Sequence, residues 1–297
     1  MLDVRRLRLL RDLARLKTIA AVARAHSYSA SAVSQQLTLL QREAGVELLA
    51  RDGRGVRLTP AGAALVAHAE TVLAALEAAD ATLAAARGGL RGMVRIGAFP
   101  TAVRTLLPAA LASLARDHPG LDLMVSELDP VAMPDALRER VLDVALVHDY
   151  DLVPAAPDPT LDATPLLEET VYLAVPAHAG ELGLPGAREA DWILGTPGTL
   201  CHTVALRACE AAGYTPRVRH HVDDFTAVLA LVAAGLGVAL VPQLGVAEVS
   251  AAVRLLPLPI RRRTSTAHRR GAGGHPAVAA CAEAVRAATE GYLRGLT

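Results

Sequence analysis

Short polar side chains gather on one face of residues 29–44, SASAVSQQLTLLQREA. They include Ser31, Ser34, Gln35 and Thr38, and almost no charged residue interrupts them near the start of the segment. A hydroxyl bonds adaptably to base edges, and a glutamine amide pairs bidentately with adenine. An ordinary solvated helix face would carry more Glu and Lys. We therefore interpret this face as one that could read bases in the major groove of DNA.

Two short predicted helices would hold this face in place. Residues 18–25 predict a first helix with Thr18 as its N-cap, and Ser29 is the expected N-cap of the second. The free amides at the start of the second helix would also favour a phosphate. A tight connection at residues 26–28 completes a helix-turn-helix pattern, although a hairpin of two core helices remains the alternative. The buried stripe of the second helix is Val33, Leu37, Leu40 and Ala44.

Basic residues flank this predicted helix pair. Residues 3–16 predict a preceding helix with a leucine stripe, and Gly45 is a natural stop for the polar helix. The turn dipeptides at residues 52–55 and the alternation at residues 56–58 predict a β-hairpin, or wing. Arginines on such a hairpin suit phosphate contacts or minor-groove insertion, although they could also be simply solvated. These arginines are Arg51, Arg54 and Arg57.

The overall composition favours a folded protein with a basic N-terminal part. Hydrophobic residues make up 52% of the 297 residues, and charged residues 20%. The formal net charge of zero is uneven, because residues 1–60 hold eleven Arg and Lys against five Asp and Glu, which leaves +6 there and −6 in the rest. A basic head on an acidic body indicates that the head meets a polyanion.

The apolar runs, the N-terminal sequence and the cysteine count together bear on the cellular location that we expect. No apolar run is free of Arg, Asp, Glu or His for a membrane-spanning length, and the N-terminus lacks a signal-peptide pattern. We therefore expect a cytoplasmic protein with no membrane partner. Three cysteines in a chain of this length do not form a disulfide framework.

A long helix is predicted from residue 60 to about residue 87, with Thr59 as its cap. Its apolar residues fall at heptad spacing, and the helix would be roughly 40 Å long at 1.5 Å per residue. A lone helix of this kind has nothing to bury its seam against, so we interpret it as a dimerisation arm. The seam consists of Leu65, Ala69, Val72, Leu76, Ala79 and Leu83.

Beyond a glycine-rich linker at residues 88–92, strands and helices alternate, which predicts an α/β domain with a mainly parallel sheet. We expect two lobes with crossings near residues 162–165 and 261–266, and a ligand site at the strand ends between them. The predicted domains are residues 1–59 (DNA binding), 60–91 (linker) and 92–297 (effector binding). Lobe I comprises residues 92–163 and 265–297, and lobe II residues 164–264.

The ordered set of motifs resembles the LysR-type transcriptional regulators over the whole chain. The segments that carry the resemblance are TIAAVARAHSYSASAVSQQLTLLQREAGVELLAR, GRGVRLTPAG, GMVRIGAFPTA, LLPAALASLARDHPGLDL, LRERVLDVALV, DDFTAVLALVAAGLGVALVP and HPAVAA. The resemblance implies a winged helix-turn-helix, a coiled-coil linker helix and a two-lobed effector domain like a periplasmic binding protein. It also implies a homodimer or homotetramer, contact with RNA polymerase, and a small-molecule effector between the lobes.

The resemblance also assigns roles to positions. DNA contacts would come from Thr18, Ser29, Ala30, Ser31, Ser34, Gln35, Thr38 and the wing residues Arg51 and Arg54. Effector contacts would come from Pro100, Thr101, Ala102, His148, Thr196, Thr199 and Phe225. The sequence departs from the family pattern at Ala30, where a longer polar residue is usual, at Ser31, where Pro is usual, and at Leu49, which replaces a frequent Phe. Ser34, Gln35 and the wing would then carry more of the specificity.

Other constellations give weaker signals. Cys201 and Cys209 lie where peroxide-sensing relatives place two redox cysteines, but the first is offset by one residue. We therefore disfavour redox sensing and expect Cys209 and Cys281 to be packing residues. His220 and His221 would point to opposite faces of a strand, which argues against a metal site. For His148, an effector contact and a satisfied core histidine remain equally open. No catalytic motif or cofactor-binding fingerprint is present, so we expect neither catalysis nor a cofactor.

These observations predict a DNA-binding transcriptional regulator switched by a small molecule. A solute-binding protein or enzyme with an appended head is one alternative. An architectural DNA-binding protein without sequence preference is another. Neither the effector, the operator, nor the choice between activation and repression follows from the sequence.

Overall fold

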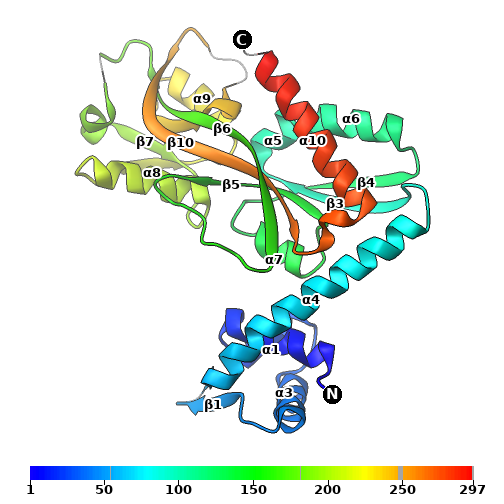
Figure 1. Cartoon of the computed structure of the whole chain (residues 1–297). Helices are drawn as coiled ribbons and strands as arrows, with labels where there is room; N and C mark the ends of the chain where they lie inside the picture. Colours follow the sequence, from blue (N-terminus) through cyan, green and yellow to red (C-terminus); the bar gives the residue numbers. More distant parts are fainter. Residues whose placement is uncertain (54, 181, 247–249, 296–297) are drawn as a thin grey trace. The chain divides into compact units, whose positions relative to one another are not determined.

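The computed structural model describes residues 1–53, 55–180, 182–246 and 250–295. It divides into two compact units, Met1–Arg87 with Arg269–His275, and Gly88–His268 with Pro276–Thr297 (Figure 1). We call the first the head unit and the second the effector unit.

Three helices form the core of the head unit. They are α1 (Val4–Leu16), α2 (Ile19–Ala25) and α3 (Ala30–Ala44). Asp3, Thr18 and Ser29 cap their N-termini by accepting hydrogen bonds from backbone amides of the first turn. The predicted caps Thr18 and Ser29 are therefore confirmed. The buried leucines and valines of the three helices pack into one core, which includes Leu10, Leu13, Val22, Val33, Leu37 and Leu40.

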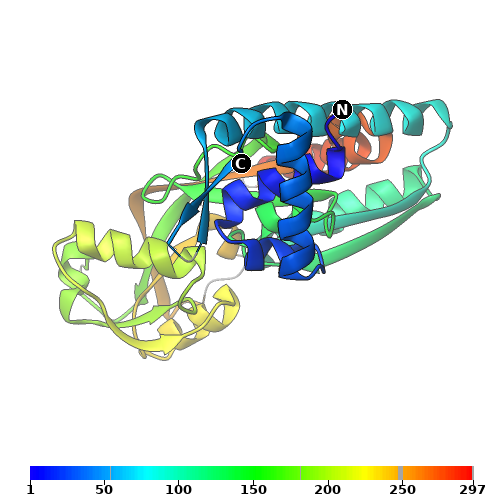
Figure 2. The ribbon, with the colours of Figure 1, turned by 90° about the horizontal axis from the view of Figure 1, so that it is seen from below.

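The wing is a two-stranded antiparallel hairpin of β1 (Leu49–Asp52) and β2 (Gly55–Leu58). It leads into α4 (Pro60–Ala86), the long helix seen along the top of Figure 2. Gly62 in the first turn of α4 lies so close to the wing that a Cβ atom there would come 2.1 Å from the carbonyl oxygen of Leu48. Only glycine allows this approach of helix to hairpin.

The faces of α4 differ in burial. Ala69 and Leu73 are buried, and Ala69 belongs to the core of the head unit, so this predicted seam residue is already covered by its own chain. Leu65 is half-buried against the same core. The remaining predicted seam residues are exposed, and they are Val72, Leu76, Ala79 and Leu83.

By length and composition alone, α4 could cross a membrane, contrary to the expectation drawn from its interrupting charges. However, α4 forms ion pairs within the head unit, which favour a role in packing. Glu70 lies 4.0 Å from Arg11 of α1, and Glu77 is paired with Arg269 at 3.3 Å. The segment Arg269–His275 packs along α4. A Cβ atom at Gly271, where φ is +86°, would lie 2.2 Å from the carbonyl oxygen of Ala74.

A six-stranded mixed sheet organises the effector unit, with the strand order β4-β3-β5-β10-β6-β9. β3 is parallel to both β4 and β5, whereas β5 with β10 and β6 with β9 are antiparallel. The strands are β3 (Gly92–Ala98), β4 (Leu121–Glu127), β5 (Val144–Tyr150), β6 (Leu161–Pro176), β9 (Ala239–Pro242) and β10 (Val253–Arg269). The sheet is thus less parallel than expected, and the two predicted crossings lie inside the long continuous strands β6 and β10.

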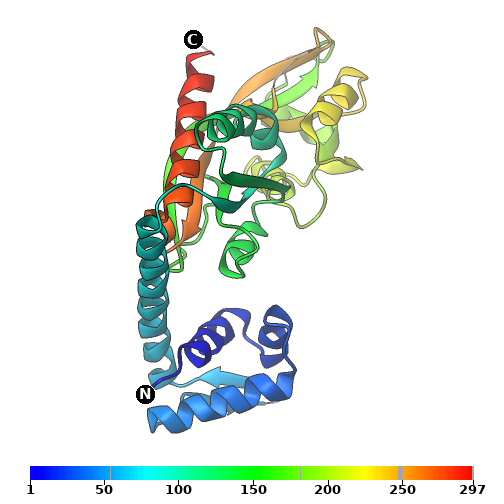
Figure 3. The same ribbon diagram turned by 90° about the vertical axis from the view of Figure 1, so that its right-hand side faces the viewer.

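Helices complete the two lobes around this sheet. In lobe I, α6 packs against α10, as Figure 3 shows for the red C-terminal helix. The lobe I helices are α5 (Pro100–Thr105), α6 (Leu107–Asp117), α7 (Met133–Arg138) and α10 (Pro276–Arg294). Lobe II adds the 3-10 helix η1 (Leu184–Glu189), the parallel pair β7 (Asp191–Leu194) and β8 (Arg217–His221), and the helices α8 (Leu200–Ala211) and α9 (Phe225–Ala233).

Two helices follow β3 in close succession. The helical segment breaks at Leu106, between α5 and α6. Pro108 stands in the first turn of α6, and because proline has no N–H it cannot continue the hydrogen-bond ladder of α5.

Candidate nucleic-acid interface and effector cavity

The polar face of α3 is exposed, and its hydrogen bonds are local, including one from the Thr38 hydroxyl to the carbonyl of Ser34 at 3.0 Å. Ser31, Ser34, Gln35 and Thr38 are all exposed. Ser29 accepts a hydrogen bond from the amide of Ala32 at 3.1 Å and lies 3.0 Å from the hydroxyl of Ser31. In the part of the chain that the structure describes, the Gln35 amide has no hydrogen-bond partner. This face therefore presents polar groups that are free to meet another molecule, with exposed Ala30 beside them.

Other glutamines of α3 support the fold instead. Gln41 accepts hydrogen bonds at 2.9 Å from the amides of Leu48 and Leu49 and so holds the start of the wing. Gln36 accepts a hydrogen bond at 2.9 Å from Nε of Arg6. Only part of the polar face is thus available to a partner.

The wing presents basic side chains. Arg51 on β1 and Arg57 on β2 are exposed, and neither forms an ion pair within the described ranges. Arg54, a predicted contact at the hairpin turn, lies outside the described residues. Thr18, the remaining predicted contact, is exposed and accepts the amide of Ala21 at 3.2 Å as the cap of α2.

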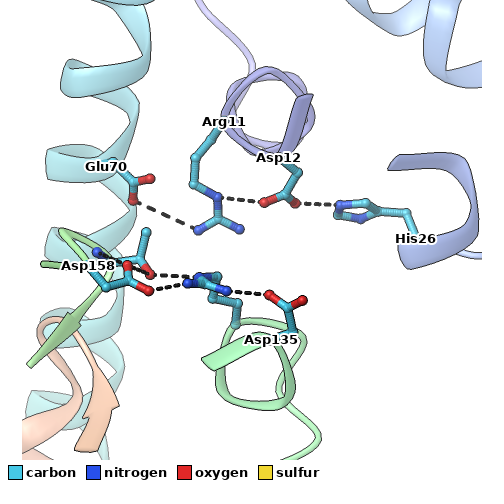
Figure 4. A network of polar contacts seen from close by, with 8 residues as sticks. Arg11, Asp12, His26, Glu70, Asp135 and Asp158 are labelled. Carbon is cyan, nitrogen blue, oxygen red and sulfur yellow. Dashed lines mark hydrogen bonds and ion pairs between the residues drawn. The ribbon is translucent and has the colours of Figure 1, made fainter. Parts of the chain in front are cut away.

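A buried polar network lies behind the helix-turn-helix. Asp12 on α1 bonds Nε2 of His26 at 2.6 Å and Nε of Arg11 at 2.8 Å, and Arg11 in turn faces Glu70 of α4 (Figure 4). Burial acts to raise the pKa of Asp12, but the bond with His26 and the charge of Arg11 outweigh it and hold that pKa below its ordinary value. The carboxylate thus joins the turn of the motif to α1.

A cavity of about 220 Å³ lies between the lobes of the effector unit. On the lobe I side, its wall is formed by the end of β3, the start of α5 and the residues after β4. The strands β5 and β10 form the middle of the wall. On the lobe II side, the wall is formed by the ends of β7 and β8 together with α8 and α9. Its lining residues include Phe99, Thr101, Glu127, Asp129, His148, Cys201, Asp223, Phe225 and Arg262.

A fully buried ion pair underlies the cavity. Arg262 on β10 donates to Glu169 on β6 at 2.9 Å, and their side chains are only 1% and 2% exposed. Arg262 also donates to the Thr101 hydroxyl at 3.2 Å, and its guanidinium lies 4.9 Å from the centre of the Phe99 ring. Glu169 further accepts the amide of Leu244 at 2.8 Å. The charge of Arg262 is therefore neutralised inside the protein.

His148 on β5 is buried against the cavity, and neither of its ring nitrogens has a hydrogen-bond partner in the described structure. Its ring makes edge contacts with Phe99 and Tyr150, at centroid distances of 4.4 and 5.4 Å. Burial, together with the charge of Arg262, lowers the pKa of His148 well below its usual range. His148 is therefore a neutral imidazole, and it is not a satisfied core histidine.

Most predicted effector contacts line the cavity. Pro100, Thr101, His148, Thr199 and Phe225 do so. Ala102 instead lies fully buried in the core of lobe I. Thr196 is exposed, and its amide and hydroxyl donate to Asp223 at 2.7 and 2.6 Å, so it holds a lining carboxylate in position.

The buried pair of Arg262 and Glu169 and the lining carboxylates were not predicted from the sequence. A signal for Arg262 was present, because Leu258, Ile260 and Arg262 share the inward face of a strand at a spacing of two. Glu169 has no comparable signal, because its partner lies 93 residues away along the chain.

The cysteines are placed differently from a redox pair. Cys201 lines the cavity with its sulfur 3.7 Å from the Tyr150 hydroxyl, whereas Cys209 is buried in the core of lobe II. Both lie on α8, and eight residues of helix separate Cα atoms by about 12 Å, beyond the roughly 7 Å that a disulfide can bridge. Burial raises the pKa of both thiols, that of Cys209 to about 11.

Comparisons with known proteins agree with this architecture. Residues 4–63 match the model of the bacterial regulatory helix-turn-helix protein, lysR family, and residues 87–290 match the LysR substrate binding domain. A Mycobacterium avium protein described as "Probable hydrogen peroxide-inducible genes activator" is 36% identical over 238 residues, which cover 76% of this chain and 73% of that protein.

Solved structures show the same fold over almost the whole chain. A cysteine-to-serine mutant of Corynebacterium glutamicum OxyR with hydrogen peroxide bound has a TM-score of 0.58 at 24% identity, and covers 99% of this chain and 94% of its own. Full-length CbnR in complex with its target DNA has a TM-score of 0.52 at 25% identity, and covers 97% of this chain and 100% of its own. The chain belongs to the LysR family of transcriptional regulators, with an N-terminal DNA-binding helix-turn-helix and a C-terminal effector-binding domain.

Proposed function

We propose that this regulator reads an operator with the exposed face of α3 and the wing, and that a small molecule in the interlobe cavity switches it. The observation that carries the proposal is the cavity with the unpartnered His148 in its wall. A buried polar group without a partner is rare in a protein interior and fits a site completed by a ligand.

On the DNA side, Ser31, Ser34, Gln35 and Thr38 would meet base edges, and Ser29 with the first amides of α3 would meet a phosphate. Arg51 and the wing would contact the backbone beside the groove. Thr18 and Arg54 stay in the proposal on the strength of the family resemblance.

The proposed domains are residues 1–59, 60–91 and 92–297, with lobe I at 92–163 and 265–297 and lobe II at 164–264. Dimerisation would use the exposed part of the α4 seam, which comprises Val72, Leu76, Ala79 and Leu83. Full-length structures of the family support a homotetramer. The proposed contact with RNA polymerase and the cytoplasmic location rest on the family resemblance. Substitution of Leu76 by Asp should then produce monomers in sedimentation, whereas Thr71→Asp, away from the seam, should not.

We propose non-covalent ligand binding and no enzymatic activity. The described residues contain no group of three potential metal ligands, and the family is regulatory. Peroxide sensing by a Cys201–Cys209 disulfide is disfavoured because both thiols have raised pKa values and α8 holds them apart. Oxidation by hydrogen peroxide should therefore leave DNA binding unchanged.

The proposal is tested by selecting fragments of the source genome with the full-length chain and measuring affinity for the recovered sites in excess competitor DNA. Selective binding that Ser34→Ala and Gln35→Ala relax supports operator reading. Binding with equal affinity for all fragments, governed only by salt, would favour an architectural protein and contradict the proposal.

A further inference from the structure

The wall of the interlobe cavity carries an excess of negative charge. Three carboxylates line it, at Glu127, Asp129 and Asp223, against one cation, Arg262. Arg262 is already bound to the buried Glu169 at 2.9 Å. Its charge is therefore compensated within the protein, although its buried Nε–H has no hydrogen-bond partner among the described residues. The formal charge of the wall is negative, with Glu127 and Asp223 exposed and Asp129 half-buried.

These carboxylates lack ionic partners of their own. Asp129 accepts only the backbone amide of Val131, at 2.9 Å, and Asp223 accepts the amide and hydroxyl of Thr196. Among the described residues, neither they nor Glu127 form an ion pair. The neighbouring Arg104 of α5 is engaged by Asp224, at 3.6 Å.

The unpartnered imidazole provides a second, independent indication of a ligand. His148 is 7% exposed, lines the cavity, and has no hydrogen-bond partner on either ring nitrogen within the described chain. As a neutral ring it offers one acceptor nitrogen and one N–H donor. A ligand with an N–H or O–H group would satisfy the acceptor, which no protein group does.

We propose that the effector is a small molecule with an apolar body and a basic amino group, and that the cavity disfavours carboxylates. This inference rests on the proposed function of the cavity as the effector site. An ammonium group would lie among three carboxylates, whereas an anion would meet them without a free cation to offset the repulsion. The apolar body would pack on Phe225, Val228 and Leu240. The volume, about 220 Å³, is below the roughly 300–1,000 Å³ of drug-sized pockets, so the effector is small.

The test compares ligands that differ only in their polar group. Phenethylamine, 2-phenylethanol and phenylacetate, with the matched hexyl series of hexylamine, hexanol and hexanoate, are titrated into the full-length protein by calorimetry at low and high salt. We expect each amine to bind about tenfold or more tighter than the matched carboxylate, and this preference to shrink as salt is added.

Variants locate the effect in the cavity. Glu127→Gln should weaken amine binding several-fold and leave alcohol binding unchanged. Asp122→Asn, an exposed carboxylate on the same strand but outside the cavity wall, is the matched control and should change neither. If both variants weakened amine binding equally, the effect would come from the general surface charge, and the assignment to the cavity would be overturned.

The outcomes separate this inference from the proposed function. Tighter binding of carboxylates, or equal binding of all three classes, overturns the amine preference but leaves the cavity as a ligand site. Absence of binding by every class would overturn the cavity as an effector site, and the amine inference with it.

Discussion

The recognition helix and the interlobe cavity both present polar side chains, but in opposite physical settings. On α3, Ser34 and Gln35 are exposed and make no contact that the fold needs. At the cavity, the lining residue Arg262 is buried and bound to Glu169 behind it, whereas the lining residue His148 is buried without a partner among the described residues. The settings also differ in charge, since the N-terminal 60 residues carry +6 and the cavity wall is acidic.

The difference separates residues that hold the protein together from residues that await a partner. Exposed side chains that form no bond within the fold, such as Gln35, can be removed at little cost to stability, so they are free to serve a partner. Buried pairs are costly to break even when they touch no ligand. A buried group without a partner belongs with the residues that await a partner despite its location, and this makes His148 the informative residue of the cavity.

The largest effect is expected from breaking the buried ion pair. Arg262→Met leaves Glu169 buried without a counter-charge and should lower the free energy of unfolding by about 3–5 kcal/mol. Urea titration followed by the fluorescence of Trp192, the single tryptophan of the sequence, measures it. The double variant Arg262→Met/Glu169→Leu should recover much of the loss. A single variant as stable as the wild type would show that the pair does not support the fold.

A smaller loss is expected from the buried network of the head unit. Asp12→Asn weakens the bonds to His26 and Arg11 and should destabilise this unit by about 1.5–3 kcal/mol at neutral pH. Hydrogen exchange of the α1 and α2 amides measures it, with Asp122→Asn as the exposed control.

The pH dependence of that loss has a definite sign. Because the folded protein lowers the pKa of Asp12, its contribution to stability is full above the ordinary aspartate pKa of about 3.9 and is lost as pH falls through the folded pKa. The difference between wild type and Asp12→Asn should therefore vanish in acid. A difference that persisted there would assign the loss to packing instead of charge.

Two glutamines of one helix sharpen the comparison further. Gln35→Ala should weaken operator binding by about 1–3 kcal/mol and leave the thermal stability unchanged. Gln41→Ala removes the acceptor of two wing amides and should lower thermal stability. Anisotropy titrations and thermal unfolding of both variants distinguish these roles. A loss of stability in Gln35→Ala would contradict the assignment of that residue to DNA.

Only a small effect on stability is expected at His148, although this residue is buried. Replacement by Phe removes no intramolecular hydrogen bond, so the free energy of unfolding should change by less than about 1 kcal/mol. Ligand binding in the cavity should fall nonetheless. A large destabilisation in urea titrations would show that His148 has a structural role, as the alternative interpretation of the sequence held.

Local patterns predicted the elements well. The caps Thr18 and Ser29, the hairpin at residues 52–55 and the long helix after Thr59 all follow from short-range signals, because capping and turn formation involve neighbours in sequence. The family resemblance placed Thr101, Thr199 and Phe225 at what proved to be the cavity wall.

Features set by distant contacts could not be predicted in the same way. The burial of Ala69 depends on how α4 packs on its own head unit, and periodicity alone cannot distinguish this from a partner helix. The pairing of Arg262 with Glu169 joins strands far apart in the chain. The acidic cavity wall likewise appears only when the loops after β4 and β8 are brought together.

The central claim is that occupancy of the cavity governs how the head reads DNA. The most direct measurement is a footprint of the full-length protein on the DNA flanking its own gene, in excess competitor, with and without a cavity ligand. We expect two protected half-sites on one face of the duplex, and a protection pattern that the ligand changes in the wild type but not in His148→Phe. Protection no stronger than nonspecific binding, or a pattern that no cavity ligand alters, would contradict it.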